Sequence, residues 1–307
     1  MRVAVVDIGT NSTRLLVADV ADGKVSEVER RSIVTRLGRG VDTSGQLAGE
    51  AIEEVCRTVA LYVEAYEWLK VERVNAIATS AVRDAENSGA FIAELRERFG
   101  LDARILAGDE EAGLVYLGAT ADRPPSSEPT LVVDIGGGST ELVLGSGNEV
   151  GFYASLQAGT VRHTERYLRS DPPDPGELDA LASDVRSLID AELTGAAIAT
   201  ASEGIAVAGT PTSLAAIDQE LDPYDPERVH GYRLPLDSIQ RMCSLLSSKT
   251  LEERLEVTGL HPGRAPTIPA GVVILIQVMR AFGLHEIEVS EHDILYGAAL
   301  QAAGRAA

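Results

Sequence analysis

The sequence predicts an α/β protein made of two duplicated domains, and three observations support this. Residues Leu131–Gly145 read LVVDIGGGSTELVLG, in which two apolar, β-branched runs flank a turn rich in glycine, the pattern of two strands joined by a tight turn. Residues Val5–Val17 align with Val132–Leu144 without a gap. The chain has 307 residues, more than a single domain usually holds. A repeat at half the chain length therefore predicts two related domains with their turns facing each other across one cleft.

The two turns share the residue types that a phosphate site needs. In the alignment Asp7 pairs with Asp134, Gly9 with Gly136, and Ser12 with Ser139. Two ordinary glycine turns are the plain alternative, but they leave the repeated aspartate and serine unexplained.

The central turn predicts a site for phosphate with a metal ion. Gly136, Gly137 and Gly138 lack a Cβ, so their N–H groups can converge on a phosphate oxygen. Asp134 and Glu141 flank these glycines and would repel a bare phosphate unless a hard cation such as Mg²⁺ lay between.

Hydrophobic periodicity and turn residues place the other elements. Gly209 and Thr210 belong to a third loop of small residues, which either holds an anion at a helix N-terminus or is only a tight strand-to-helix turn. A polar, proline-rich linker is expected at residues 122–129. Strands are expected at residues 24–35, 74–79, 103–106, 149–155, 205–208 and 287–289. Helices are expected at 47–69, from Asn87 or Ser88 as cap to Phe99 with Gly100 closing the helix, at 176–193, 235–248 and 293–303, and up to 282 from a start near Pro266 or Pro269. Further helices are expected to open at residues 108, 159 and 209.

Composition limits the partners and the compartment. The formal charge of −20 argues against nucleic acid or an anionic membrane as a partner. No apolar run is long enough to span a bilayer, and a strand expected at the very N-terminus leaves no room for a signal peptide. Cys56 and Cys243 lie in helical patterns and are typical of buried thiols, so we expect a cytoplasmic protein.

These motifs resemble the exopolyphosphatase and guanosine pentaphosphate phosphatase family, which has the actin-like, ribonuclease H-like fold. The resemblance rests on DIGTNSTRLL, the Arg83 loop, Gly108–Ala112, DIGGGSTEL, Gly159–Thr164, Gly209–Leu214 and RAPTIPAG. It implies two actin-like domains with mixed sheets flanked by helices and an interdomain cleft. Domain I would span residues 1–122, with a C-terminal helix near 292–307 packing back on it, and domain II residues 123–291.

The resemblance also implies the chemistry, which is hydrolysis of a terminal phosphoanhydride by attack of water. Glu111 matches the family's catalytic glutamate, and Arg83 matches an arginine that grips phosphate, with an ion pair to Asp84 or Glu86 as its plain alternative. Asp134 and Glu141 would bind Mg²⁺, with K⁺ as an additional candidate cofactor. Phosphate would be held by Asp7, Asn11, Ser12, Gly136, Gly137, Gly138, Ser139, Gly209 and Thr210.

The sequence departs from the family pattern at two places. Pro266 replaces an acidic residue in the RAPTIPAG segment, and Tyr296 stands where an arginine is common. Longer members carry an additional helical region after the point where this chain ends. Together with the acidic composition, this favours short polyphosphates as substrate.

Three other functions stay open at this point. Hydrolysis of the 5′-phosphate of guanosine pentaphosphate (pppGpp) is the nearest, because it cleaves the same kind of bond. An ATP-dependent kinase of the same fold and a regulator that binds nucleotide or polyphosphate without turnover are more distant. Dimers are common in the family, but no surface in the sequence indicates a homodimer.

Overall fold

The chain divides into two compact units, each an α/β fold. The structure is a computed structural model that describes residues 1–123, 128–147, 149–193 and 201–304. Unit 1 consists of Met1–Arg123 together with the C-terminal segment from Asp293, and unit 2 runs from Pro124 to His292. The predicted α/β class with mixed sheets flanked by helices is confirmed. Parts of the expected linker, at residues 124–127, lie outside the described residues.

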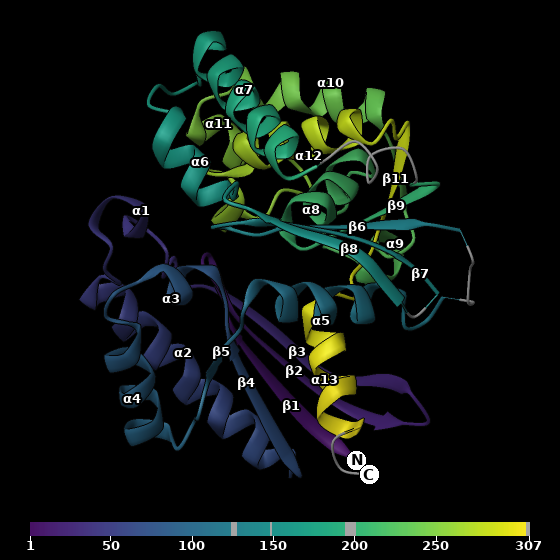
Figure 1. Cartoon of the computed structure of the whole chain (residues 1–307). Helices are drawn as coiled ribbons and strands as arrows, with labels where there is room; N and C mark the ends of the chain where they lie inside the picture. Colours follow the sequence, from purple (N-terminus) through teal and green to yellow (C-terminus); the bar gives the residue numbers. More distant parts are fainter. Residues whose placement is uncertain (124–127, 148, 194–200, 305–307) are drawn as a thin grey trace. The chain divides into compact units, whose positions relative to one another are not determined.

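Unit 1 is built on a five-stranded mixed sheet within the described residues (Figure 1). Strand β1 (Arg2–Ile8) lies at its centre, antiparallel to β2 (Ser12–Ala21) and parallel to β4 (Arg73–Ala78). Residues 3–6 and Ile8 of this strand are apolar, which fits a strand whose two faces are both buried. The edge strands are β3 (Lys24–Val34) and β5 (Arg104–Ile105), and the helices are α1 (Val41–Ser44), α2 (Gly49–Trp68), α3 (Ser80–Asp84), α4 (Ser88–Phe99), α5 (Gly108–Thr120) and α13 (Ile294–Gly304).

The alternation of side chains along β1 sorts them between two helical layers. Ala4, Val6 and Ile8 join the core formed with α2, while Val3, Val5 and Asp7 alternate with them and point to the other face. Helix α13 contacts β1, β2 and β4 and packs along α5 (Figure 1). The position of Asp7 in the strand therefore places it on the opposite face from the α2 core.

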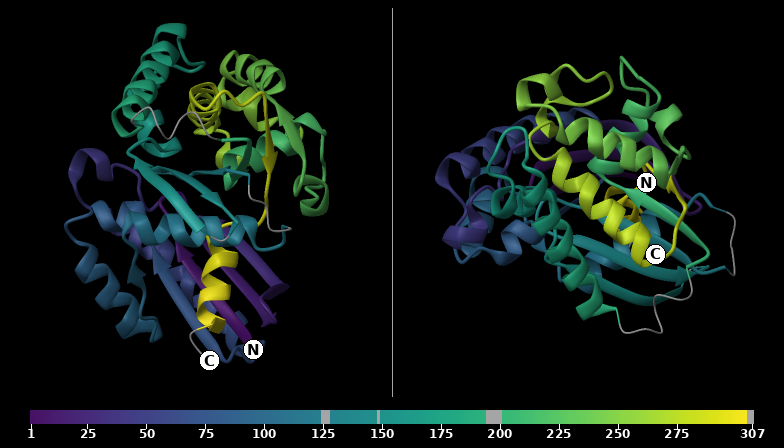
Figure 2. Two further views of the ribbon diagram at one scale, coloured as in Figure 1. Left: turned by 45° about the vertical axis from the view of Figure 1, so that its right-hand side comes forward. Right: turned by 90° about the horizontal axis from the view of Figure 1, so that it is seen from above.

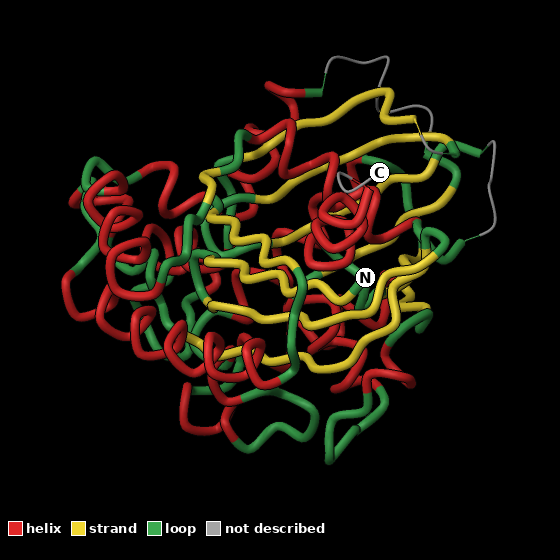
Figure 3. The backbone as a smooth tube through the Cα atoms, turned by 90° about the horizontal axis from the view of Figure 1, so that it is seen from below, coloured by secondary structure: helices red, strands yellow, loops and turns green. Residues whose placement is uncertain are grey.

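Unit 2 repeats this strand order. Strand β6 (Thr130–Ile135) is central, antiparallel to β7 (Thr140–Ser146) and parallel to β9 (Glu203–Val207). The described sheet has six strands in the order β10-β11-β9-β6-β7-β8, so β8-β7-β6-β9-β11 corresponds to β3-β2-β1-β4-β5 of unit 1. Figure 3 draws the strands of both units in yellow. The remaining strands are β8 (Glu149–Leu156), β10 (Arg233–Pro235) and β11 (Glu286–Val289). The shared order shows that the sequence repeat reflects two related folds.

The helices of unit 2 pack around one buried helix. Helix α12 (Ile268–Ala281) contacts α6, α7, α8 and α10 (Figure 2). Nearly every residue of α12 is buried, which explains why its sequence is apolar all round. The surrounding elements are α6 (Thr160–Tyr167), α7 (Pro175–Glu192), α8 (Gly209–Asp218), α9 (Pro226–Val229), α10 (Leu236–Ser247), α11 (Leu251–Leu255) and a 3₁₀ turn η2 (Pro262–Arg264).

Most expected elements are found within two or three residues, and one predicted cap is wrong. Asn87 precedes α4 as expected, but its side chain does not cap the helix. Its amide instead accepts a hydrogen bond from the N–H of Leu47 at 2.9 Å and donates one to the Leu47 carbonyl at 3.0 Å. A tertiary contact 40 residues away thus replaces the local one. Gly100 ends the helix in the left-handed conformation, as predicted (φ 65°).

No helix in the described part of the chain combines the length and the apolar character that crossing a membrane requires. Cys56 is buried and Cys243 is half-buried, and both are free thiols.

Candidate functional site

The turn between β1 and β2 is closed by its own backbone. The N–H of Gly9 donates to the carbonyl of Ser12 at 3.0 Å, and the carbonyl of Asn11 accepts hydrogen bonds from Thr35 and Arg36. Asn11 and Ser12 are half-buried in this turn. These contacts fix the turn directly after Asp7.

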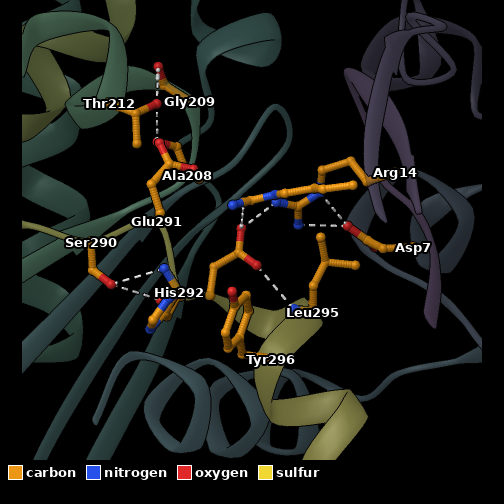
Figure 4. Close-up of polar contacts among 12 residues, drawn as sticks. Asp7, Arg14, Ala208, Gly209, Thr212, Ser290, Glu291, His292, Leu295 and Tyr296 are labelled. Atoms are coloured by element: carbon orange, nitrogen blue, oxygen red, sulfur yellow. Dashed lines mark hydrogen bonds and ion pairs between the residues drawn. The ribbon is translucent and has the colours of Figure 1, made fainter. Parts of the chain in front are cut away.

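Asp7 is held from one side by Arg14, its cross-strand neighbour on β2. Nε and Nη2 of Arg14 donate to the same oxygen, Oδ2, at 2.8 and 2.6 Å (Figure 4). The other oxygen, Oδ1, is buried and accepts no hydrogen bond from the described residues. Burial raises the pKa of the Asp7 carboxyl, although the Arg14 guanidinium acts against this. Asp7 thus keeps one buried carboxylate oxygen that its described neighbours leave without a hydrogen bond.

Glu111 and Arg83 contact each other in unit 1. Glu111 lies in the first turn of α5 and is 6% exposed, and Arg83 lies in the short helix α3 after β4. Nη1 of Arg83 donates to Glu111 Oε2 at 2.7 Å and to the Leu106 carbonyl at 2.9 Å. The suggested partners Asp84 and Glu86 have other contacts, to Ser80 and to Gln46.

The surroundings of Glu111 raise the pKa of its carboxyl above the usual value for a glutamate. Burial raises the pKa of its carboxyl, and the hydrogen bond and charge of Arg83 lower it, with the raising effect dominant. The charge of Asp7 also raises the pKa of Glu111. This side chain therefore holds its negative charge less firmly than an exposed glutamate does.

Unit 2 presents the equivalent hairpin with a different charge pattern. The N–H of Gly136 donates to the Ser139 carbonyl at 3.0 Å, as Gly9 does in unit 1. Asp134 and Glu141 are cross-strand neighbours and are 8% and 2% exposed. Glu141 Oε1 also accepts a hydrogen bond from Ser155 at 2.9 Å. Two buried carboxylates thus lie side by side next to the glycine turn.

The three glycines of this turn use their carbonyls to hold helix α6. The carbonyl of Gly136 accepts the N–H of Thr160 at 2.9 Å, and that of Gly137 accepts the N–H of Val161 at 2.9 Å. A Cβ on Gly159 would overlap the backbone of Gly137 and Gly138. Because the N–H of Gly136 is already donated to Ser139, backbone donors to a phosphate would have to come from the glycines after it.

The loop of Gly209 and Thr210 opens α8 and is covered by an arginine that the site prediction did not include. The guanidinium of Arg264 lies where a Cβ on Gly209 would be. Nη1 of Arg264 contacts the hydroxyls of Thr212 at 3.3 Å and Ser213 at 3.5 Å. Figure 4 shows the hydroxyl of Thr212 between Ala208 and Gly209, to whose carbonyls it donates at 3.0 and 3.4 Å. The RAPTIPAG segment, which begins with Arg264, is the sequence signal that could have found this residue.

Sequence comparison identifies the family. The profile of the Ppx/GppA phosphatase family matches residues 16–302 of the 307. The chain belongs to the Ppx/GppA phosphatase family. The predicted family is therefore confirmed, and with it the predicted enzyme class, a hydrolase.

Relatives and solved structures of the Ppx/GppA family match along the whole chain. "Exopolyphosphatase 2" of Mycobacterium tuberculosis is 38% identical over 99% of both chains. A crystal structure of the Aquifex aeolicus family member is 31% identical, covers 100% of this chain and 98% of its own, and gives a TM-score of 0.84. A structure titled an exopolyphosphatase from Cytophaga hutchinsonii is 25% identical over 98% of both chains, with a TM-score of 0.90.

The two departures from the Ppx/GppA pattern have local structural roles. Tyr296 is buried in α13, and its hydroxyl donates to Glu27 Oε2 at 3.3 Å. Burial and the Glu27 charge raise the pKa of the tyrosine hydroxyl. Pro266 is half-buried between η2 and α12.

The donor set for a metal is partial in unit 2. Within the described ranges, no group of three or more His, Cys, Asp or Glu side chains is arranged to hold a metal ion. Asp134 and Glu141 nevertheless supply two neighbouring carboxylates, the oxygen donors that Mg²⁺ prefers when water and substrate phosphates complete its coordination.

Proposed function

We propose that this chain releases orthophosphate from the ends of inorganic polyphosphate. The observation that carries the proposal is the hydrogen bond between Arg83 and Glu111, which joins a guanidinium to a buried carboxylate in a member of a phosphatase family. The name of the M. tuberculosis relative, 38% identical along its whole length, favours polyphosphate as the substrate.

Glu111 would be the base that prepares water for attack. The oxygen of the water forms a bond to the terminal phosphorus while the bond to the bridging oxygen breaks, and the bridging oxygen leaves with the shortened chain. Glu111 takes the proton of the water and later releases it to solvent. Its raised pKa supports this role because a stronger base takes a proton more readily.

Arg83 would serve Glu111 and substrate together. Its contacts to Glu111 and to the Leu106 carbonyl use one terminal nitrogen, Nη1. A guanidinium keeps its charge at neutral pH and can grip phosphate oxygens with more than one N–H. The same residue can therefore orient the base and compensate the charge of the transferred phosphoryl group.

Asp134 and Glu141 would hold Mg²⁺, with K⁺ to be tested as an additional cation. A bound Mg²⁺ would supply charge neutralisation on the phosphate oxygens. The position of Glu141 supports this, since it places a second negative charge beside Asp134 where unit 1 has Arg14 beside Asp7. We assign phosphate contacts to Gly137, Gly138, Ser139, Gly209 and Thr210 in unit 2 and to Asp7, Asn11 and Ser12 in unit 1; Gly136 shapes the turn.

Short polyphosphates are the proposed form of the substrate. The chain carries a formal charge of −20, so each further phosphate that lies over its surface meets net repulsion. Hydrolysis of pppGpp is the second candidate, because the family profile covers phosphatases of both kinds in its name. A kinase of related fold has no comparable support.

The test is phosphate release from polyphosphates of graded length and from pppGpp, measured side by side with Mg²⁺ with and without K⁺. We expect turnover of short polyphosphate, at least 100-fold lower in Glu111→Gln. Glu110→Gln is the matched control, because Glu110 precedes Glu111 in the same helix turn and pairs with Arg104. Preferred cleavage of pppGpp would replace the substrate assignment, and full activity of Glu111→Gln would remove the base.

A further inference from the structure

Arg14 is clamped between two carboxylates of unit 1. Nε and Nη2 donate to Oδ2 of Asp7, and Nη1 donates to Oδ2 of Asp293. The side chains of Asp7 and Asp293 are 3% and 2% exposed, so both ion pairs are shielded from water. The guanidinium cannot turn without breaking a charge-assisted hydrogen bond at one end.

The two carboxylate oxygens of Asp293 accept hydrogen bonds from different groups. Oδ1 accepts the N–H of Leu295 at 3.0 Å and so holds the start of helix α13 (Figure 4). Oδ2 holds Arg14 and lies 4.0 Å from Nη2 of Arg30. The cap on helix α13 uses only Oδ1 of Asp293. The contact between Oδ2 and Arg14 is therefore not needed for capping.

The place of Asp293 is set by close backbone packing. A Cβ on Gly118 of α5 would overlap the carbonyl oxygen of Asp293, and a Cβ on Gly297 of α13 would overlap that of Leu114. Arg73 and Asn75 on β4 donate to the carbonyls of Ala302 and Ala298 further along α13. These contacts fix the backbone position of Asp293, so its side chain can hold Arg14 in one place.

We infer that Asp293 is a positioning residue that acts through Arg14 to fix the orientation of Asp7. With Oδ2 of Asp7 taken by two nitrogens of Arg14, the free buried oxygen Oδ1 has one defined position. Asp293, near the end of the chain, thereby fixes the orientation of the carboxylate of Asp7, 286 positions earlier. This inference rests on the proposed function only in so far as Asp7 contacts substrate phosphate.

The plain alternative is that Asp293 only attaches α13 to the sheet, and matched variants separate the two. Asp293→Asn keeps an oxygen for the cap on Leu295 but removes the charge that holds Arg14. Arg73→Met removes a tether of α13 at 2.6 Å without touching Arg14. Asp19→Asn breaks another arginine–aspartate pair of the β1–β2 ladder, Arg2–Asp19, at an exposed site.

The first measurement is steady-state hydrolysis. We expect Asp293→Asn to lower kcat roughly ten-fold, equivalent to a slightly misplaced catalytic group, and Asp293→Glu to recover part of the loss. In an Arg14→Met background, Asp293→Asn should cause no further loss of kcat, because it acts through Arg14. Losses of kcat in Arg73→Met equal to those in Asp293→Asn, or fully additive losses in the double variant, would overturn the inference.

The second measurement needs no activity. In ¹⁵N NMR spectra, rotation of the Arg14 guanidinium about its Nε–Cζ bond should be slow in the wild type, in Arg73→Met and in Asp19→Asn, but fast in Asp293→Asn. Slow rotation that persists in Asp293→Asn would contradict the inference. If the wild type hydrolyses neither polyphosphate nor pppGpp, the proposed function fails while this spectroscopic result still decides the role of Asp293.

Discussion

Arg14 and Glu141 occupy the same position in two duplicated hairpins, one opposite Asp7 and the other opposite Asp134. The backbone of the two turns is closed in the same way, by Gly9 to Ser12 and by Gly136 to Ser139. Duplication thus kept the geometry while the charge at this position was reversed. One hairpin has a cation built into its second strand, and the other has a second carboxylate there, which we propose as a ligand of Mg²⁺.

Glu141→Gln should therefore raise the Mg²⁺ concentration needed for half-maximal activity by about ten-fold, since one of two charged ligands is lost. Activity at saturating Mg²⁺ should fall less. Phosphate release over a Mg²⁺ titration measures both quantities. Ser155→Ala serves as the control, because it removes only the hydroxyl that donates to Glu141. An unchanged Mg²⁺ dependence in Glu141→Gln would remove this residue from the metal site.

Arg83→Met should shift the acid side of the pH–activity profile to higher pH. The Arg83 guanidinium lowers the pKa of Glu111, so its loss lets burial raise that pKa further and delays formation of the carboxylate as pH increases. The profile of kcat/KM between pH 5 and 9 measures the shift. Arg83→Lys, which keeps a positive charge, should move the profile less; equal shifts in the two variants would argue against an effect of charge.

The raised pKa of Glu111 also predicts that the stability difference between Glu111→Gln and the wild type changes with pH. Its folded-state pKa is raised, so the ionised form destabilises the fold, and the wild type loses stability as pH rises from the unfolded pKa through the folded one. Gln resembles the protonated form. The Tm of Glu111→Gln relative to the wild type should therefore increase between pH 4.5 and pH 8 in thermal unfolding. A Tm difference that stays constant or falls over this range would contradict the raised pKa.

Sequence patterns predicted the strands, the long helices and the repeated turns because each is encoded locally, by periodicity or by glycine. The contacts that complete the site are tertiary. Arg83 donates to Glu111, 28 positions later in the chain, and no spacing in the sequence marks that contact. The role of Asp293 depends on a helix that returns to the first sheet after the whole of unit 2.

Two glycines of one helix differ for the same reason. Gly113 and Gly118 both lie in α5, but a Cβ on Gly113 meets open space, whereas one on Gly118 meets the backbone of Asp293. Only the packing of α13 against α5 distinguishes them.

Gly118→Ala should destabilise the protein by at least 1–3 kcal/mol, the usual cost of overpacking, because the atoms in its way are backbone and cannot turn aside. Gly113→Ala is the matched control in the same helix and should stabilise by about 0.5–1 kcal/mol through helix propensity. Denaturant unfolding measures both. Similar stability in the two variants would contradict the close α5–α13 contact.

Gly209→Ala should weaken substrate binding with little loss of stability. The added Cβ would overlap the guanidinium of Arg264, which is the flexible end of a long side chain and can move away without disturbing the backbone. Its displacement would break the contacts with Thr212 and Ser213 and change the charge presented at the start of α8. We expect KM for short polyphosphate to rise roughly five-fold with kcat nearly unchanged, about 1 kcal/mol of uniform binding. Arg264→Met should reproduce this rise in KM, and adding Gly209→Ala to it should raise KM no further, since both changes act through the same guanidinium. If Gly209→Ala raised KM equally in the two backgrounds, the small-residue loop itself, and not the arginine above it, would be the part that binds phosphate.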